Sequence, residues 1–245
     1  MTTKDDQEVR PKARDTIHYD IIEWFRDKKR GSVLDAPAGF GHLSLRLTEM
    51  GFKVVCGEIE PEIFRVKDLT CTFTDLNRHI DAPDESFDYV CCVDGLEHMT
   101  DPYQAVKEFS RVLRRGGYGI FSVPNYTNIE KRMKYLLNGY LTKPVGMERY
   151  RKQGSLFNFH NSPLTITILE FMFSINGLEI VEIRKNAPKK KQYLLLPLVA
   201  VIKFANLFGS RRHREKHRTD LTLHPNVILG GNNIICITRK TTAKK

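Results

Sequence analysis

The feature that most limits how this chain can fold is the alternation of apolar runs with amphipathic segments between residues 31 and 125. Strands that alternate with helices form parallel βαβ units, whose helices cover both faces of one sheet. The pattern therefore predicts an α/β fold. Strands are expected at residues 32–34, 53–57, 71–74, 87–93 and 118–123, helices at 42–50 and 103–113, and a turn at 114–117.

Helix signals also lie outside this region. The spacing of apolar residues predicts a helix over 13–29, which Gly31 ends. Ser162 with Pro163 behind it is typical of a helix start, and Gly177 of a helix stop. Also expected are an amphipathic helix over 127–141, an irregular polar stretch over 143–158, and strands at 178–183 and 233–238.

Acidic residues and glycines gather where the first three strands end. Ligands of open α/β sheets bind beyond the carboxyl ends of the strands. Gly39 and Gly41 follow Asp35, so the backbone there can approach a ligand closely. Glu58 can accept hydrogen bonds from both hydroxyls of a ribose, and Asp75 from an exocyclic amine. The sequence thus predicts a site for an adenosine that carries a charged group.

Two cofactors meet that description. A nicotinamide dinucleotide prefers GxGxxG, but the third glycine position, 44, is Ser. S-adenosylmethionine carries an amino acid in place of a pyrophosphate, and Asp35 is placed to meet its ammonium group.

Four motifs in order resemble class I S-adenosylmethionine-dependent methyltransferases. They are VLDAPAGFG (33–41), CGEIEPE (56–62), FDYVCCVDGLEHMTDP (87–102) and RVLRRGGYGIFSVPN (111–125). The similarity is greatest to the small-molecule group that includes ubiquinone and menaquinone methyltransferases. It implies a Rossmann-like, seven-stranded, mostly parallel sheet of order 3-2-1-4-5-7-6, with the last strand antiparallel.

The resemblance also implies S-adenosylmethionine as the cofactor and a division of the chain. A proline at position 37, where the family has its first glycine, fixes φ and removes an N–H donor. The implied cofactor-binding residues are Asp35, Ala36, Pro37, Gly39, Gly41, Glu58, Ile59, Asp75, Leu76 and Asp94. The implied segments are an N-terminal helical segment (1–30), the cofactor-binding core (31–125), an acceptor lid (126–160), the completion of the sheet (161–184 and 226–240) and an insert (185–225).

Methyl transfer to oxygen benefits from a general base. His98, after the fourth strand, and His160, before a predicted helix, are the candidate catalytic residues, and Asn125-Tyr126 are expected near the acceptor. Packing or local capping is the alternative role for each histidine. No metal ligand is assigned, although Asp94, Glu97 and His98 together offer oxygen and nitrogen ligands for a divalent cation.

The net charge of +10 is distributed unevenly. Residues 31–124 carry 15 acidic and 9 basic side chains, whereas residues 185–245 carry 2 and 14. Within 185–218, basic clusters flank the apolar run 194–208, which is shorter than the ~20 residues that span a bilayer. Such a segment suits an anionic membrane surface. The alternatives are packing on the protein's own core and another partner.

The chain is therefore interpreted as a methyltransferase of a small, lipid-linked or glycan-related acceptor, with oxygen as the favoured atom. Envelope-polysaccharide and lipid methyltransferases have a similar insert. An RNA methyltransferase and a catalytically silent membrane scaffold are the alternatives, and nucleic acid is not favoured. Five cysteines without a pairing pattern, and no apolar leader in 1–15, favour the cytoplasm with peripheral membrane contact. The oligomeric state is left open.

Overall fold

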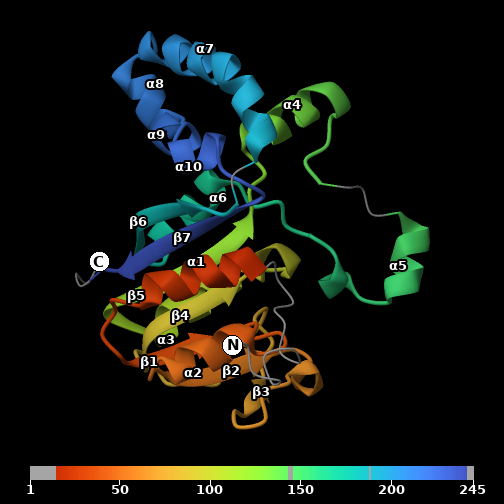
Figure 1. The fold of residues 1–245 in the computed structure, drawn as a ribbon, viewed down its shortest axis with the longest axis vertical. Helices are drawn as coiled ribbons and strands as arrows, with labels where there is room; N and C mark the ends of the chain where they lie inside the picture. The colour runs from red at the N-terminus through yellow and green to blue at the C-terminus, as the bar shows by residue number, and fades with distance from the viewer. Residues whose placement is uncertain (1–14, 143–145, 188, 242–245) are drawn as a thin grey trace.

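The structure, a computed structural model, describes residues 15–142, 146–187 and 189–241. Its centre is one seven-stranded sheet of order β3-β2-β1-β4-β5-β7-β6 (Figure 1). Strand β7 runs antiparallel to both of its neighbours, β5 and β6. The predicted fold class, strand order and antiparallel last strand are confirmed. The strands are β1 (Ser32–Asp35), β2 (Lys53–Glu58), β3 (Cys71–Phe73), β4 (Phe87–Val93), β5 (Leu113–Pro124), β6 (Leu178–Lys185) and β7 (Asn233–Lys240).

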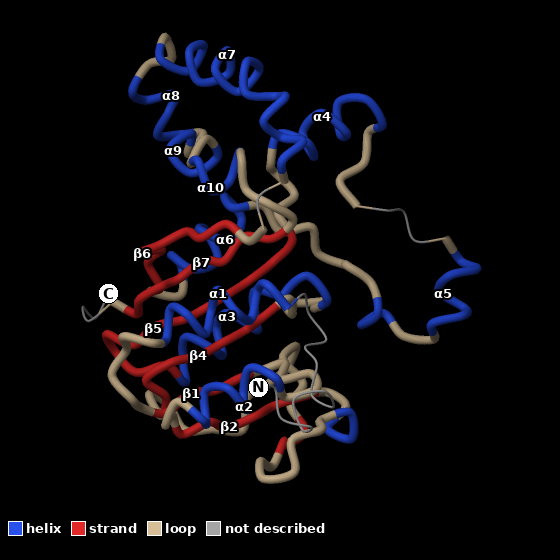
Figure 2. The backbone as a smooth tube through the Cα atoms, viewed as in Figure 1, coloured by secondary structure: helices blue, strands red, loops and turns tan. Residues whose placement is uncertain are grey.

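Helices cover both faces of the sheet (Figure 2). On one face, α1 and α2 bury Ile17, Phe25 and Leu43 against β1, β4 and β7. On the other face, α3 and α6 bury Phe109 and Phe173. The α-helices of the sheet layers are α1 (Asp15–Phe25), α2 (His42–Glu49), α3 (Pro102–Val112) and α6 (Ile166–Ile175).

The remaining helices lie outside the two main helix layers: in Figure 1, α7, α8, α9 and α10 lie beyond the β6 edge of the sheet, and α5 lies off the carboxyl ends of the parallel strands. Three of them share a small apolar cluster around Ile129, Val199 and Ile228. No helix among the described residues is long and apolar enough to cross a membrane. These helices are α4 (Ile129–Asn138), α5 (Met147–Gln153), α7 (Leu196–Leu207), α8 (Arg211–Lys216), α9 (Thr219–Thr222) and α10 (Pro225–Ile228).

Two predicted elements near β5 are wrong in their bounds. The expected turn at 114–117 belongs to β5, whose pairing with β4 shifts in register between Phe87 and Tyr89. Gly116 has a left-handed backbone, φ 74°, where the strand departs from regular pairing. The helix predicted over 127–141 is shorter, because the Asn128 side chain caps its start and Gly139, at φ 71°, ends it.

Three further expectations are corrected. The stretch predicted as irregular, 143–158, contains α5 and a 3-10 turn, Leu156–Asn158. The N-cap of α6 is Thr165, not Ser162, because the Ser162 hydroxyl instead donates to the Met99 carbonyl at 3.0 Å. Helix α1 ends at Phe25, before the predicted residue 29. Residues 13 and 14 of that predicted helix lie outside the described residues. So do the other residues of 1–14, to which the prediction of no apolar leader refers.

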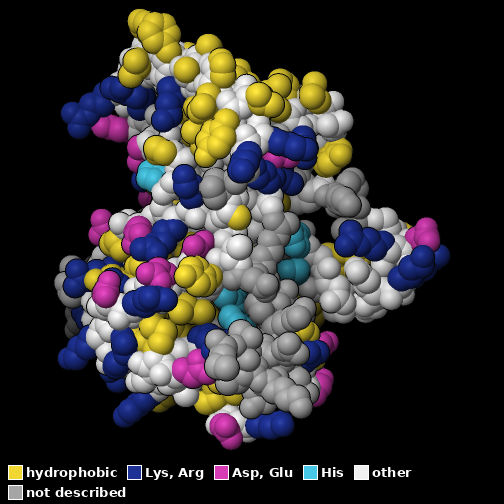
Figure 3. All heavy atoms as spheres, in the orientation of Figure 1, with side chains coloured by type: hydrophobic (Ala, Val, Ile, Leu, Met, Phe, Trp, Pro, Cys, Tyr) yellow, Lys and Arg dark blue, Asp and Glu magenta, His cyan; other side chains and the backbone are white. Residues whose placement is uncertain are grey.

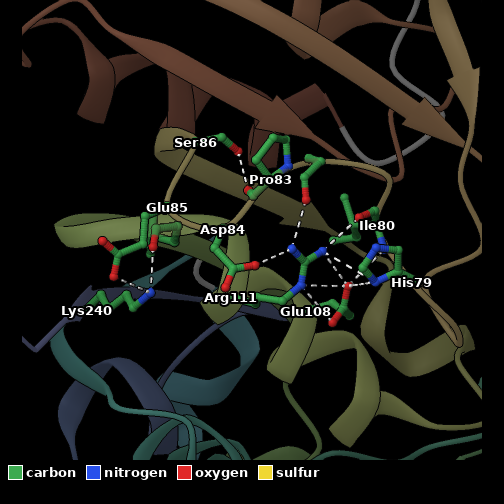
Figure 4. A network of polar contacts seen from close by, with 11 residues as sticks. His79, Ile80, Pro83, Asp84, Glu85, Ser86, Glu108, Arg111 and Lys240 are labelled. Atoms are coloured by element: carbon green, nitrogen blue, oxygen red, sulfur yellow. Dashed lines mark hydrogen bonds and ion pairs between the residues drawn. The ribbon is translucent and has the colours of Figure 1, made fainter. Parts of the chain in front are cut away.

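Arg111 of α3 ties the loop between β3 and β4 to the helix layer (Figure 4). Its guanidinium donates to the Ile80 and Ala82 carbonyls, both at 2.8 Å, and pairs with Asp84 at 2.7 Å. It also pairs at 2.8 Å with Glu108, whose side chain is only 6% exposed and which accepts from the Ile80 amide. This network fixes the loop that follows the third strand end.

Arg111→Ala is expected to lower the free energy of unfolding by about 1.5–3 kcal/mol, because a nearly buried carboxylate loses a charged donor. Arg26→Ala is the matched control. It removes an ion pair of the same i,i+3 spacing whose side chains are 60% and 51% exposed, and is expected to cost about 0.2–1 kcal/mol. Urea unfolding of both variants measures the difference. Equal losses would contradict the structural role of the Arg111 network.

Candidate functional site

A cavity of about 730 Å³ opens at the carboxyl ends of the parallel strands, within the usual range for small-molecule sites. Histidine side chains show near the middle of this face of the molecule (Figure 3). The structure brings together most of the residues that the sequence predicted. Those lining the cavity are Asp35, Pro37, Gly39, Glu58, Ile59, Asp75, Leu76, Asp94, His98 and His160.

Asp35 ends β1 and is almost fully buried. Its carboxylate accepts a hydrogen bond from the Ser44 hydroxyl at 2.6 Å. The pKa of Asp35 is raised to about 7, mainly by burial; the hydrogen bond from Ser44 opposes this rise, and the nearby Glu58 adds to it. A cationic ligand at this position would favour the ionised carboxylate.

Glu58 closes the turn that follows β1. Its two carboxylate oxygens accept from the Gly39 amide at 2.8 Å and from the Ile59 amide at 2.9 Å. Each carboxylate oxygen carries two lone pairs, so each retains acceptor capacity for a ligand hydroxyl. The side chain is therefore held in one orientation by the backbone while it lines the cavity.

Asp75 lies at the third strand end in a tight local turn. Its Oδ1 accepts from the backbone amide and the side-chain amide of Asn77, at 3.0 and 3.1 Å. Its Oδ2 lies 3.3 Å from the Arg78 guanidinium. Leu76 is buried beside it. The acid and the apolar side chain thus occupy one edge of the cavity.

Asp94 follows β4 in a left-handed conformation, φ 49°. Its carboxylate accepts from the Ser122 hydroxyl at 2.6 Å and from the Asn233 side-chain amide at 2.8 Å. Non-glycine residues at positive φ are uncommon and cluster at functional sites. The bonds to β5 and β7 hold this backbone at the centre of the sheet edge.

The far end of the cavity contains two histidines that are distant in sequence. The rings of His98 and His160 meet edge to face with centroids 4.9 Å apart. Tyr126 is buried, and its hydroxyl lies 2.9 Å from His160 Nδ1. Burial lowers the pKa of His160, as do the neighbouring His98, Lys131 and Arg149. His160 is therefore neutral at pH 7 and able to accept a proton.

The segment around residue 162 explains how His160 reaches His98. The Ser162 amide donates to the Glu97 carbonyl at 3.1 Å, and the Asn161 side chain donates to the His98 carbonyl at 3.2 Å. These bonds fasten the approach to α6 onto the loop after β4. The sequence could not show this contact, because it joins residues more than 60 positions apart.

Glu97 is almost fully buried. Burial and the nearby Asp94 raise its pKa well above the usual value. Its Oε2 has no hydrogen-bond partner among the described residues. Ligand atoms of Glu97, His98 and His160 lie within 4.8 Å of one another, which is close enough to hold a cation. The candidate ligands for a divalent cation are therefore Glu97, His98 and His160, rather than the set with Asp94 that the sequence suggested.

Three residues expected at the site lie outside the cavity lining. Ala36 is fully buried, and its amide donates to the Cys91 carbonyl. Gly41 has φ 89°, and a Cβ there would lie 2.6 Å from the Phe64 ring, so it serves the backbone turn into α2. The Asn125 side-chain amide donates to the Val227 carbonyl and thereby ties the segment after β5 to α10.

Two lining histidines escaped the sequence analysis. His18 Nδ1 lies 3.1 Å from His42 Nδ1, and both residues line the cavity. Burial and His42 lower the pKa of His18 to about 3, so it stays neutral. In the sequence, His18 follows Ile17, an apolar residue of the predicted helix, and this neighbourhood gives no sign of a ligand site. Its approach to α2 depends on helix packing.

Comparison with known proteins agrees with this geometry. Residues 34–121 match the family model described as a methyltransferase domain. Over residues 34–121 the chain is thus similar to methyltransferase domains. The resemblance to S-adenosylmethionine-dependent methyltransferases predicted from the motifs is thereby confirmed.

Relatives of the methyltransferase domain span only part of the chain. A ubiquinone biosynthesis O-methyltransferase of Hydrogenovibrio crunogenus is 28% identical over 118 residues, which are 44% of this chain and 49% of that protein. One of Xanthomonas oryzae is 25% identical over 150 residues, or 57% and 63%. The chain therefore spans less than two thirds of the length of these relatives.

Solved structures agree in fold. A SAM-dependent methyltransferase from Archaeoglobus fulgidus superimposes with a TM-score of 0.54 at 14% identity, covering 91% of this chain and 94% of that one.

The strand-end half of the cavity suits the cofactor that a methyltransferase domain implies. The acids Asp35, Glu58 and Asp75 lie along it, whereas the lining Lys131 and Arg149 come from the α4–α5 side. An acidic edge suits the ammonium, ribose and amine of S-adenosylmethionine better than a pyrophosphate. By this test the residues fit the cofactor.

Proposed function

We propose that this chain is an S-adenosylmethionine-dependent methyltransferase that methylates an oxygen of a small acceptor, lipid-linked or glycan-related. The observation that carries the proposal is the neutral His160, hydrogen-bonded to Tyr126 in the cavity that also contains the acidic strand ends. A base beside a cofactor cleft is what an oxygen acceptor requires. The names of the ubiquinone O-methyltransferases support the choice of oxygen.

The proposed roles follow the cavity from one end to the other. Asp35 binds the ammonium, Glu58 the ribose hydroxyls, Ile59 one face of the adenine, and Asp75 with Leu76 its edge. S-adenosylmethionine supplies the electrophilic methyl group. The protein aligns the two reactants and excludes water, which lowers the entropic cost of an in-line displacement.

His160 is the proposed general base. The reactive tautomer carries its proton on Nδ1 and donates it to the Tyr126 oxygen, which leaves Nε2 free to accept the acceptor's hydroxyl proton. Burial, with Glu97 and Asp94 nearby, raises the Tyr126 pKa above its usual value, so the phenol stays neutral and orients the ring. His98 packs against His160 and is the second proposed catalytic residue.

Segment 126–160 is the proposed acceptor lid. Its residues Tyr126, Lys131, Leu141, Arg149 and Phe159 line the cavity opposite the strand ends. Apolar and basic side chains together suit an acceptor that carries a hydrocarbon part and a phosphate or carboxylate.

Affinity for S-adenosylmethionine is expected to rise with pH. Below pH 7 the Asp35 carboxyl of the free protein is protonated, because its pKa is about 7. Binding of the ammonium requires the carboxylate, so Kd should fall about tenfold per pH unit up to that point and then level off. Asp35→Asn should bind weakly with a flat profile. A flat profile for the unaltered protein would contradict this role.

The proposed function is tested by incubating the protein and isotopically labelled S-adenosylmethionine with lipid and polar fractions of a cell extract. Mass spectrometry should find the label as an O-methyl group in a lipid or glycan product. Label found only in RNA would instead support the alternative of an RNA methyltransferase. Cofactor binding without any labelled product would favour the silent scaffold.

A further inference from the structure

An unusually apolar surface lies at the end of the molecule formed by α4 and α7 (Figures 1 and 3). We call it the apolar crest; its members are Leu136, Leu137, Leu194, Phe204, Leu207 and Phe208. Each of these side chains is between 61% and 84% exposed. A monomer rarely leaves so many large apolar side chains together in water, and such a patch marks an interaction site.

Phe204, Leu207 and Phe208 of the crest lie in α7 or at its C-terminal end, and the inner side of this helix is already packed. Val199 of α7 is buried with Ile129 and Ile228, and Leu195, Leu198 and Ile202 pack against that cluster. The outer positions, among them Phe204 and Phe208, are equally apolar. Apart from Lys203 and Asn206, α7 is apolar on its exposed side as well as on its packed side. An exposed apolar side of a helix is stabilised by a partner that covers it. Packing on the protein's own core, the alternative role for the apolar run 194–208, thus explains only the inner face of α7.

Basic side chains surround the crest. Lys190 and Lys191 precede α7, Lys203 lies within it, and Arg212 and Arg214 follow in α8. All five are exposed, and none forms an ion pair with a carboxylate of residues 15–142, 146–187 or 189–241. Figure 3 shows the dark blue side chains beside the yellow crest. The surface therefore requires a partner that is both apolar and anionic.

We propose that the apolar crest and its basic rim dock on an anionic lipid bilayer, with α7 lying in the interface. Apolar side chains enter the headgroup boundary while lysines and arginines meet lipid phosphates. A second copy of the chain is a poorer occupant, because a two-fold contact would bring two cationic rims together.

Docking would also bring the candidate site to the membrane. Leu136 and Leu137 of the crest belong to α4, whose Lys131 lines the cavity, as does Leu141 just beyond that helix. The crest and the cavity therefore share one structural element. This proposal rests on the exposed surface alone and stands whether or not the chain transfers methyl groups.

The test is flotation of the full chain with vesicles of phosphatidylcholine, either alone or mixed with phosphatidylglycerol. The bound fraction on anionic vesicles is expected to be at least about tenfold higher than on neutral ones, and to fall at high salt. The triple variant Phe204→Ser, Leu207→Ser, Phe208→Ser should lose binding. The control is Phe171→Ser with Ile175→Ser, which removes exposed apolar side chains from α6, away from the crest.

Circular dichroism shows whether each variant keeps its fold. An intact protein that stays out of the floated fraction with anionic vesicles at low salt would overturn the proposal. So would equal binding by the triple variant. A dimer in solution that the triple variant converts to monomers would assign the crest to self-association instead.

Discussion

Replacing His160 by glutamine is expected to lower kcat for methyl transfer by about 10²–10⁴-fold, the usual contribution of a general base. The imidazole is the proposed base, and its burial lowers its pKa, so that it is neutral at pH 7. Glutamine retains hydrogen bonding but accepts no proton. Affinity for S-adenosylmethionine should be unchanged, because the proposed cofactor-binding residues lie at the strand ends and not at His160. Single-turnover kinetics at saturating cofactor measures the effect.

The pH profile separates a base from a merely structural residue. The unaltered enzyme should gain activity as the pH rises through a pKa below the usual histidine value of about 6.5, and then level off. His160→Gln should lack this acidic limb, whereas Tyr126→Phe should keep it with a smaller loss of kcat. His213→Gln, in the exposed helix α8, is the control and should match the unaltered enzyme.

A chelator distinguishes the base from the alternative cation site. Activity that chelation abolishes and a divalent cation restores would assign Glu97, His98 and His160 to metal binding. If His160→Gln kept the acidic limb of the pH profile, the proposed base would be wrong, whatever the effect of the chelator.

The second large effect is expected at Glu58. Glu58→Ala removes the proposed acceptor for both ribose hydroxyls and the carboxylate that accepts from the Gly39 amide. Hydrogen bonds to charged groups contribute about 1.5–3 kcal/mol each, so Kd for the cofactor should rise at least about 100-fold. Saturating S-adenosylmethionine should raise the melting temperature of the unaltered chain but not that of Glu58→Ala.

Glu62→Ala is the matched control for this experiment. Glu62 lies four residues further along the same acidic motif, is exposed and does not line the cavity. Its substitution should leave the ligand-induced rise in melting temperature intact. The Glu58 assignment would be wrong if both variants behaved alike.

The cavity-lining residues at the strand ends could be predicted from the sequence, because each of them directly ends or follows its own strand. Asp35, Glu58 and Asp94 end buried strands, and parallel strands must bring their carboxyl ends to one edge. The strand order came from the resemblance, since periodicity alone does not order seven strands. Apolar patterning also located β4 with its observed bounds, because all of its residues except Asp88 are buried and form a nearly continuous apolar run.

The acceptor side could not be predicted in the same way. The contact of His160 with Tyr126 depends on Ser162 bonding the loop after β4 rather than capping α6. A serine before a proline favours an N-cap locally, and tertiary contacts overrode that preference. The His18–His42 contact likewise depends on how α1 packs on α2, which no local pattern encodes.

We infer that the acidic strand ends form a site for S-adenosylmethionine. Titration calorimetry of the full chain tests it most directly, with S-adenosylmethionine and its demethylated product as ligands. The expected result is one binding site for each ligand, with binding lost in Glu58→Ala and kept in Glu62→Ala. Absence of binding by either ligand to the unaltered, folded chain would contradict the claim.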